Sequence, residues 1–153
     1  MSLIVRRAIK KDWFEVAELD RKAWLGYPHG DMIPDGEHTW RIWMDTMVFC
    51  AIIGKKIVGA ALAFPTLNAG KFVLHKVFVD ADYRGQGIGT LLVQSVGAEL
   101  DTLGKVCYVT VSPENVSAIK VYESAGFTKR QYVKGYYHSD ENRLVITRNP
   151  NTN

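Results

Sequence analysis

The chain has 153 residues, of which 47% are hydrophobic and 23% charged, and its formal net charge is +3. These values fit one globular domain with a buried core and exclude a largely disordered chain. Basic residues occur only as short pairs, which argues against a nucleic-acid partner. We therefore predict a single domain over residues 1–148 and a flexible tail over residues 149–153.

The cysteines and the hydropathy pattern further restrict which class of protein this can be. Cys50 and Cys107 lie in apolar runs without the spacing of metal ligands, so we expect two buried free thiols and no metal site. No apolar stretch reaches the roughly 18 residues of a membrane span, and no signal peptide opens the chain. The expectation is an intracellular, cytoplasmic protein without membrane contact.

Hydrophobic periodicity predicts the elements in chain order. The first half reads as strand, helix, loop, helix and then a hairpin, with these residues: 3–9, 11–24, 25–31, 35–47, and 48–53 with 57–64. The second half reads as strand, helix, strand, helix and two strands, with these residues: 71–79, 88–100, 105–111, 115–124, 127–137 and 143–148. Gly126 is expected just past the end of the last helix.

The resulting order is β-α-α-β-β-β-α-β-α-β-β. Antiparallel hairpins combined with one β-α-β unit predict a mixed α/β sheet with helices on its faces. No internal repeat or linker interrupts this pattern.

The most informative segment joins the strand that ends at Val79 to the helix that begins at Ile88. Gly85, Gly87 and Gly89 alternate there. A helix start presents unpaired N–H groups and partial positive charge, and glycines let phosphate oxygens approach them. The pattern predicts a site for an anion, most naturally a pyrophosphate, with Arg84 as a charged donor at its lip. An isolated glycine pair at such a junction is also compatible with a simple tight turn.

Two other phosphate motifs fit poorly. The chain lacks Gly-Lys-Ser/Thr, so it has no P-loop, and its glycine spacing in mid-chain disfavours a dinucleotide-binding fold.

A second group of residues follows in the helix predicted at 115–124. Asn115 and Tyr122 are seven residues apart and share a helix face with Ala118, whose small side chain leaves room for a ligand along that stripe. In a purely structural interpretation, Asn115 is a helix cap and Tyr122 is a tyrosine of the core.

Taken together, the two segments resemble a known family. Arg84-Gly85-Gln86-Gly87-Ile88-Gly89 is similar to the coenzyme A signature Arg/Gln-x-x-Gly-x-Gly/Ala of GNAT acetyltransferases, and Asn115-x-x-Ala118-x-x-x-Tyr122-x-x-x-Gly126-Phe127 resembles the family's second motif. The resemblance covers residues 71–137, and the predicted element order also agrees with the GNAT acyl-CoA N-acyltransferase fold.

This resemblance implies an acetyl-CoA-dependent N-acetyltransferase. In the family the pantetheine arm lies in a gap between two parallel strands, which assigns backbone contacts to Val77, Phe78 and Val79 and arm contacts to Asn115 and Ala118. The pyrophosphate would bind at the remaining residues of the signature: Arg84, Gly85, Gln86, Gly87, Ile88, Gly89 and Thr90.

The chemistry implied is direct attack of a neutral amine on a thioester. Tyr122 is implied as the general acid that protonates the leaving thiolate, because a phenol is protonated at neutral pH. Some relatives carry a glutamate as base where this chain has Thr110. His75 is a candidate base, in phase with Val77 and Val79 unless a bulge intervenes. A chain of water molecules remains an alternative. Four further residues are also candidate bases: Glu18, Asp20, Glu37 and His38.

The acceptor is expected to be a small-molecule amine or polyamine, with a protein or peptide N-terminal amine of the ribosomal-protein-alanine type as the alternative. Tyr27, His29 and Tyr136 are the candidate acceptor contacts, and Tyr136-Tyr137 resembles the tail of relatives that acetylate protein N-termini. A non-catalytic acyl-CoA-binding module also stays open. Exposed edge strands are compatible with a homodimer.

Overall fold

The computed structural model describes residues 2–25 and 33–151. Its strands are β1 (Leu3–Arg7), β2 (Met47–Ile53), β3 (Lys56–Pro65), β4 (Lys71–Val79), β5 (Val106–Val111), β6 (Lys129–Val133) and β7 (Arg143–Arg148). Its helices are α1 (Trp13–Ala23), α2 (Glu37–Trp43), α3 (Ile88–Leu103) and α4 (Val116–Ser124), with 3₁₀ turns at Lys10–Asp12 and Ala81–Tyr83. None of these helices is long and apolar enough to cross a membrane.

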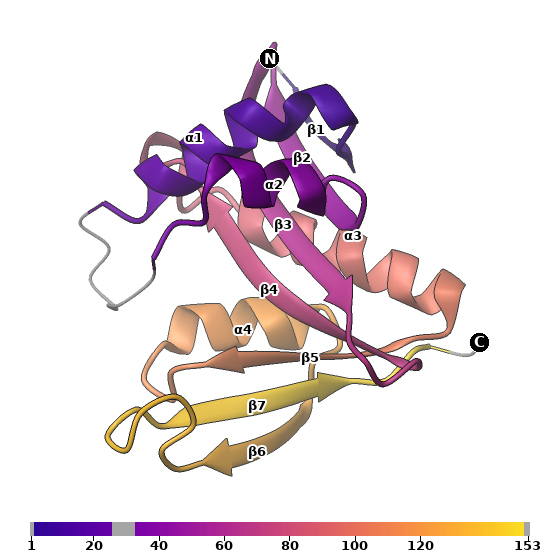
Figure 1. Cartoon of the computed structure of the whole chain (residues 1–153), viewed down its shortest axis with the longest axis vertical. Coiled ribbons are helices and arrows are strands. Elements are labelled where there is room, and N and C mark those ends of the chain that lie inside the picture. The colour runs from indigo at the N-terminus through magenta and orange to yellow at the C-terminus, as the bar shows by residue number, and fades with distance from the viewer. Residues whose placement is uncertain (1, 26–32, 152–153) are drawn as a thin grey trace.

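The strands form one seven-stranded sheet in the order β1-β2-β3-β4-β5-β7-β6. Every neighbouring pair is antiparallel except β4 and β5, which are parallel and joined through α3 (Figure 1). The predicted mixed α/β sheet and its order of elements are therefore confirmed.

Each face of the sheet carries its own core. Helices α1 and α2 cover β2, β3 and part of β4 around the fully buried Trp40, whereas α3 and α4 pack on the other face around Leu92 and Phe127 (Figure 1). Strands β2 and β3 are buried on both faces, which explains why they read as continuous apolar runs rather than as alternating patterns. Cys50 lies in the first core and Cys107 in the second, as free thiols.

Strands β4 and β5 pair over a short distance only. Among the described residues, their ladder joins Lys71–Val73 of β4 to Val106–Tyr108 of β5 and ends there. Beyond it β4 stays paired with β3 up to Val79, and β5 stays paired with β7 up to Val111. The two strands start side by side and then diverge, which opens a gap in the middle of the sheet (Figure 1).

A buried ion pair holds α1 against β4. The Lys76 Nζ lies 2.9 Å from both carboxylate oxygens of Asp20, and both side chains are essentially inaccessible to solvent. Asp20 also accepts hydrogen bonds from the indole N–H groups of Trp24 and Trp40 and from the backbone N–H of Asp35. This set of donors satisfies the carboxylate, which a buried charge requires.

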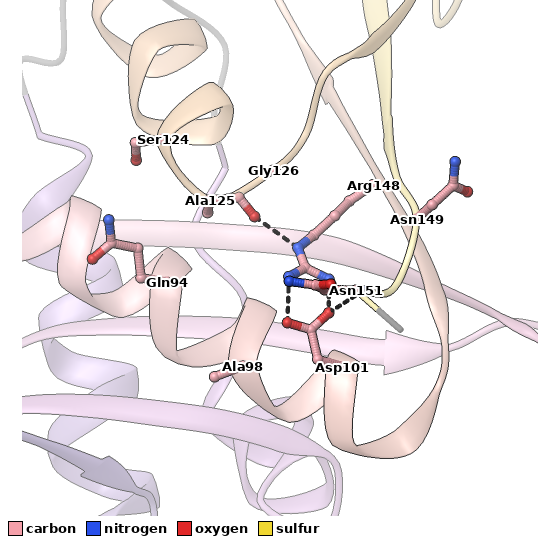
Figure 2. A pocket seen from close by; sticks show the side chains of 9 residues that line it. All are labelled: Gln94, Ala98, Asp101, Ser124, Ala125, Gly126, Arg148, Asn149 and Asn151. Carbon is pink, nitrogen blue, oxygen red and sulfur yellow. Dashed lines mark hydrogen bonds and ion pairs between the residues drawn. The ribbon is translucent and has the colours of Figure 1, made fainter. Parts of the chain in front are cut away.

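A second ionic contact ties the C-terminal strand to the helices of the other face. Arg148 at the end of β7 donates two hydrogen bonds to Asp101 of α3, at 2.8 and 3.0 Å, and a third to the Ala125 carbonyl after α4. Figure 2 shows this guanidinium beside a shallow depression between the two helices. The Asn151 backbone N–H also donates to Asp101, so the chain is anchored beyond residue 148.

Two predicted elements are six residues longer than the observed ones, whereas the other elements differ by at most three residues in length. The helix expected at residues 35–47 spans only Glu37–Trp43 and begins after Gly36. The strand expected at 127–137 spans only Lys129–Val133, because Gly135 adopts a positive φ of 64° and its N–H donates to the Asn142 side chain. Tyr136 and Tyr137 therefore belong to the loop between β6 and β7.

The two cysteines should be inert in the native protein. Burial raises the pKa of Cys50 and of Cys107 to about 12, so thiolate is scarce at pH 8, and neither sulfur is exposed. We expect Ellman's reagent to react with both thiols only after unfolding in guanidinium chloride. Rapid reaction of the native protein would show that one of the two cores is open.

Loss of Lys76 should be far more damaging than loss of a surface lysine. Lys76→Met leaves Asp20 charged and buried without its counter-ion, and breaking such a pair typically costs about 3–5 kcal/mol of unfolding free energy. The matched control is Lys10→Met, because Lys10 lies 3.6 Å from Asp45 with both side chains largely exposed. The control should change stability by less than about 1 kcal/mol. Urea unfolding followed by circular dichroism measures both values, and equal losses would contradict this account.

Candidate active site

The gap between β4 and β5 ends at the start of α3. Strand β4 leads through the turn Ala81–Tyr83 into the glycine segment and then into α3, while β5 leads into α4. The end of β4 therefore leads to the N-terminus of α3, and the end of β5 leads to the start of α4, at the end of the gap where the two strands have diverged (Figure 1). Such an opening offers backbone hydrogen-bonding groups and a positive helix end to the same ligand.

The glycine segment has the geometry that close approach of an anion requires. Gly85 and Gly87 adopt φ angles of 76° and 78°, in the left-handed region that side chains rarely tolerate. Space is open where a Cβ would lie at Gly85, Gly87 and Gly89, and Gly87 is the N-cap of α3. The amides of this segment can therefore reach a ligand without steric hindrance.

The side chain of Arg84 has a different orientation from the one expected at the lip of that site. Its Nε donates to the Val79 carbonyl at 3.1 Å, and its terminal nitrogen donates to the Ala23 carbonyl at 2.6 Å. These bonds join the loop to the end of β4 and to the C-terminus of α1. In this structure Arg84 holds the loop in place.

Asp80, which we did not single out from the sequence, fixes the same turn. Its buried carboxylate accepts from the Asp82 N–H at 3.0 Å and from the Lys56 Nζ at 3.0 Å, and Lys22 lies 3.6 Å away. Burial opposes the charged form, but these donors prevail and the pKa of Asp80 is lowered. An aspartate directly after a strand and before a turn is a capping signal, so the sequence carried the information.

The residues of the second motif lie at the start and along the length of α4. Asn115 is the N-cap: its Oδ1 accepts from the Ala118 N–H at 3.2 Å and from the Ser117 hydroxyl. Its Nδ2 makes no hydrogen bond to any described residue, so this end of the amide can still donate to a ligand. Tyr122 packs edge-on against Phe127, with 6.1 Å between the ring centroids, and Gly126 follows the helix with a φ of 92°.

Side chains alternate along the part of β4 that borders the gap. Val77 and Val79 pack on the face of α3, whereas Phe78 is buried on the opposite face against Trp40. The side chain of Ile88 is also buried, in the core beneath α3. Phe78 and Ile88 can consequently contribute only backbone groups to a ligand in the gap.

A β-bulge changes the orientation that was expected for His75. Leu62 of β3 pairs with Lys76 and Ala63 pairs with Leu74, so His75 is the extra residue. Its ring contacts Trp43 and Phe64, with centroids 5.1 and 5.6 Å away, on the face of α1 and α2. His75 is therefore out of phase with Val77 and Val79, which is the exception that was stated for a bulge.

His75 is part of a polar cluster that continues into the buried ion pair. Its Nε2 lies 3.4 Å from the Asp35 Oδ2, which is also 2.7 Å from the Lys76 Nζ. The His75 side chain is 36% exposed, so it is accessible from solvent while its neighbours are fixed. Neither this cluster nor any other in residues 2–25 and 33–151 gathers three metal-binding side chains.

The face of β5 opposite to α3 and α4 carries the remaining candidates. The Thr110 hydroxyl lies 2.9 Å from the Tyr137 hydroxyl, and the rings of Tyr136 and Tyr137 stack edge-on with centroids 4.7 Å apart. Burial, with smaller effects of nearby Tyr108 and Tyr137, raises the pKa of Tyr136, which keeps that phenol neutral. Tyr27 and His29 lie outside the described residues.

Three acidic side chains that could bind a cationic acceptor are engaged in ion pairs. Besides Asp35, Glu37 pairs with Arg21 at 3.0 Å and Glu141 pairs with Arg143. These carboxylates are already neutralised by side chains of the protein.

Comparisons with known proteins agree with this geometry. The model of the acetyltransferase (GNAT) family matches residues 13–127. An uncharacterised N-acetyltransferase of Methanocaldococcus jannaschii is 29% identical over 146 residues, which cover 86% of this chain and 63% of that protein. The [ribosomal protein bS18]-alanine N-acetyltransferase of Escherichia coli is 32% identical over 85 residues, covering 55% of this chain and 57% of that protein. The matches thus span less than two thirds of both relatives.

A solved structure shows the same fold. The phosphinothricin acetyltransferase of Sinorhizobium meliloti, determined in complex with acetyl-CoA, superposes with a TM-score of 0.80 at 17% identity, covering 98% of this chain and 89% of that one. Since the family model covers most of the chain, including the glycine segment and the second motif, the chain belongs to the acetyltransferase (GNAT) family.

Proposed function

We propose that this protein is an acetyl-CoA-dependent N-acetyltransferase that acts on a primary amine. The observation that carries the proposal is the position of the glycine segment at the mouth of the β4–β5 gap. A phosphate-binding helix start and a free strand edge lie next to each other, which suits a ligand with a pyrophosphate at one end and an amide-rich arm at the other.

The residues present fit coenzyme A. The open space at Gly85, Gly87 and Gly89 admits the pyrophosphate to the amides of residues 85–90. The backbone of β4 from residue 77 to residue 79 would pair with the amides of the pantetheine arm, and the Asn115 Nδ2 would donate to it from the other side. Bound in this way, acetyl-CoA would supply an activated acetyl group at the closed end of the gap.

The protein's own groups would manage the protons. Tyr122, on α4 beside the gap, would donate its phenolic proton to the departing thiolate. His75 would accept a proton from the acceptor amine, directly or through water, because its ring is accessible and Asp35 lies within reach of Nε2. Asp35 would in that case be a positioning residue that holds the ring.

Peptide amines suit the acceptor side better than polyamines do. A polyamine needs several free carboxylates, but Asp35, Glu37 and Glu141 are paired with cations of the chain. Tyr136 and Tyr137 offer aromatic and hydroxyl contacts beside Thr110 instead. The relative from Escherichia coli is, by its name, an alanine N-acetyltransferase that acts on ribosomal protein bS18. We therefore propose a peptide α-amine as the acceptor.

Replacement of Tyr122 by phenylalanine tests the proposed chemistry. We expect wild-type protein to release coenzyme A and to acetylate a short peptide with a free α-amine. Tyr122→Phe should lower kcat by about 100-fold or more, because a general acid typically contributes 10²–10⁴-fold, while the Kd for acetyl-CoA stays near the wild-type value. The matched control is Tyr132→Phe, since Tyr132 is an exposed tyrosine on β6.

Three outcomes would contradict the proposal at different points. Full activity of Tyr122→Phe would remove Tyr122 from the role of acid. Binding of acetyl-CoA by the wild-type protein without transfer to peptides or to spermidine would favour the non-catalytic acyl-CoA-binding module, and transfer to spermidine alone would reinstate the polyamine acceptor.

A further inference from the structure

A groove lies on the sheet face that carries α1 and α2, in the part of this face that the two helices do not cover. It has a volume of about 440 Å³ and lies between the β3–β4 turn, β5 and the β6–β7 loop. Lys71, Tyr108, Gln131 and Tyr136 are among its lining residues. Because Tyr108 is also the last β5 residue in the β4–β5 ladder, the groove begins at the closed end of the gap.

Lys71 gives this groove its charge. It is the only ionisable lysine, arginine or carboxylate among the described residues that line the groove. Its Nζ lies 4.9 Å from the centroid of the Tyr108 ring, and no carboxylate of the described chain pairs with it. The backbone of Lys71 is fixed on both sides, since its N–H donates to the Asn68 carbonyl and its carbonyl accepts from the Thr66 N–H.

Charged side chains on the elements around the groove include Lys129 on β6 and the carboxylates of Asp140 and Glu141 on the β6–β7 loop. Lys129 lies two strands away in the same row of the sheet as Tyr108, with Thr147 between them. The nearby carboxylate of Glu141 is neutralised by Arg143. A cation that has an aromatic neighbour and lacks a carboxylate partner is suited to bind an anionic group of a ligand.

The spacing along β4 sets where such a group would lie. Lys71 is two residues from Val73, where the ladder ends, which corresponds to about 7 Å along the strand. An extended peptide advances about 3.3–3.6 Å per residue. A peptide whose α-amine enters the closed end of the gap would therefore bring the side chain of its second or third residue to Lys71.

We propose that Lys71 selects acceptor peptides with an acidic side chain at the second or third residue. This inference rests on the proposed peptide acetyltransferase function and specifies its substrate class. The carboxylate of the acceptor would bind the ammonium above the Tyr108 ring, and a lysine at the same peptide position would be repelled.

A matched set of peptides and variants tests this selection. The peptides would share one sequence and differ only at the third residue, which is Glu, Gln or Lys. For wild-type protein we expect kcat/KM for the Glu peptide to exceed that for the Lys peptide by about tenfold, as for a charge-assisted contact. Lys71→Met should abolish the preference, and Lys71→Glu should invert it in favour of the Lys peptide. Lys10→Met, a change on a remote surface, should keep the wild-type preference.

The possible results separate this inference from the proposed function. A second series of peptides would be varied at the second residue in the same way. If the neutral Gln peptides are acetylated but the charge has no effect in either series, the role proposed for Lys71 is wrong while the acetyltransferase function stands. If none of the peptides is acetylated although acetyl-CoA binds, the proposed peptide acceptor fails and this inference fails with it. Inversion of the preference by Lys71→Glu, at unchanged acetyl-CoA affinity, would establish the contact.

Discussion

The separation of β4 from β5 is the feature on which the rest of the site depends. The two parallel strands share only three ladder pairs, and each then follows a different antiparallel neighbour. Buried backbone groups seldom remain without hydrogen-bond partners, so the free edge of β4 needs water or a ligand. The same divergence places the start of α3 and the start of α4 beside the gap, so the helix start proposed to bind phosphate lies next to the strand edge proposed to bind the pantetheine amides (Figure 1).

The buried Lys76–Asp20 pair orders the part of the structure that we propose to bind the acceptor. Lys76 follows the bulge at His75, and both side chains face α1 and α2 rather than α3. Asp20 also binds the backbone N–H of Asp35, so the segment that enters α2 is held beside His75. Replacement of both members of a buried ion pair by hydrophobic residues often costs little stability. Here the pair also orders the polar cluster next to the gap, which gives it a second role.

Much of the fold could be predicted from the sequence, for identifiable reasons. The apolar runs of β2 and β3, the amphipathic pattern of α3 and the glycine at the end of α4 are local signals, and they gave the correct order of elements. The limits of α2 and β6 were wrong because both depend on contacts between separate segments. The Asp35 N–H before α2 donates to Asp20, and the Gly135 N–H after β6 donates to Asn142.

The site was predictable to the extent that its chemistry is carried by backbone geometry. Alternating glycines before a helix imply positive φ and open space, and both are present. Side-chain orientations were harder to predict. The bulge at His75 has no signal in the sequence. Arg84 donates hydrogen bonds to the carbonyls of Val79 and Ala23, and Ala23 is distant in the sequence. Lys71 could not be singled out either, because the groove that it lines is formed by segments far apart in the chain.

The central claim is that acetyl-CoA binds along the free edge of β4. Amide hydrogen exchange of the whole protein, measured by NMR with and without acetyl-CoA, tests it most directly. The account predicts slower exchange at amides within residues 74–79 and 85–90 on addition of acetyl-CoA, with little change in β1 and β2. Binding of acetyl-CoA without added protection in β4, or no binding at millimolar concentration, would contradict the claim.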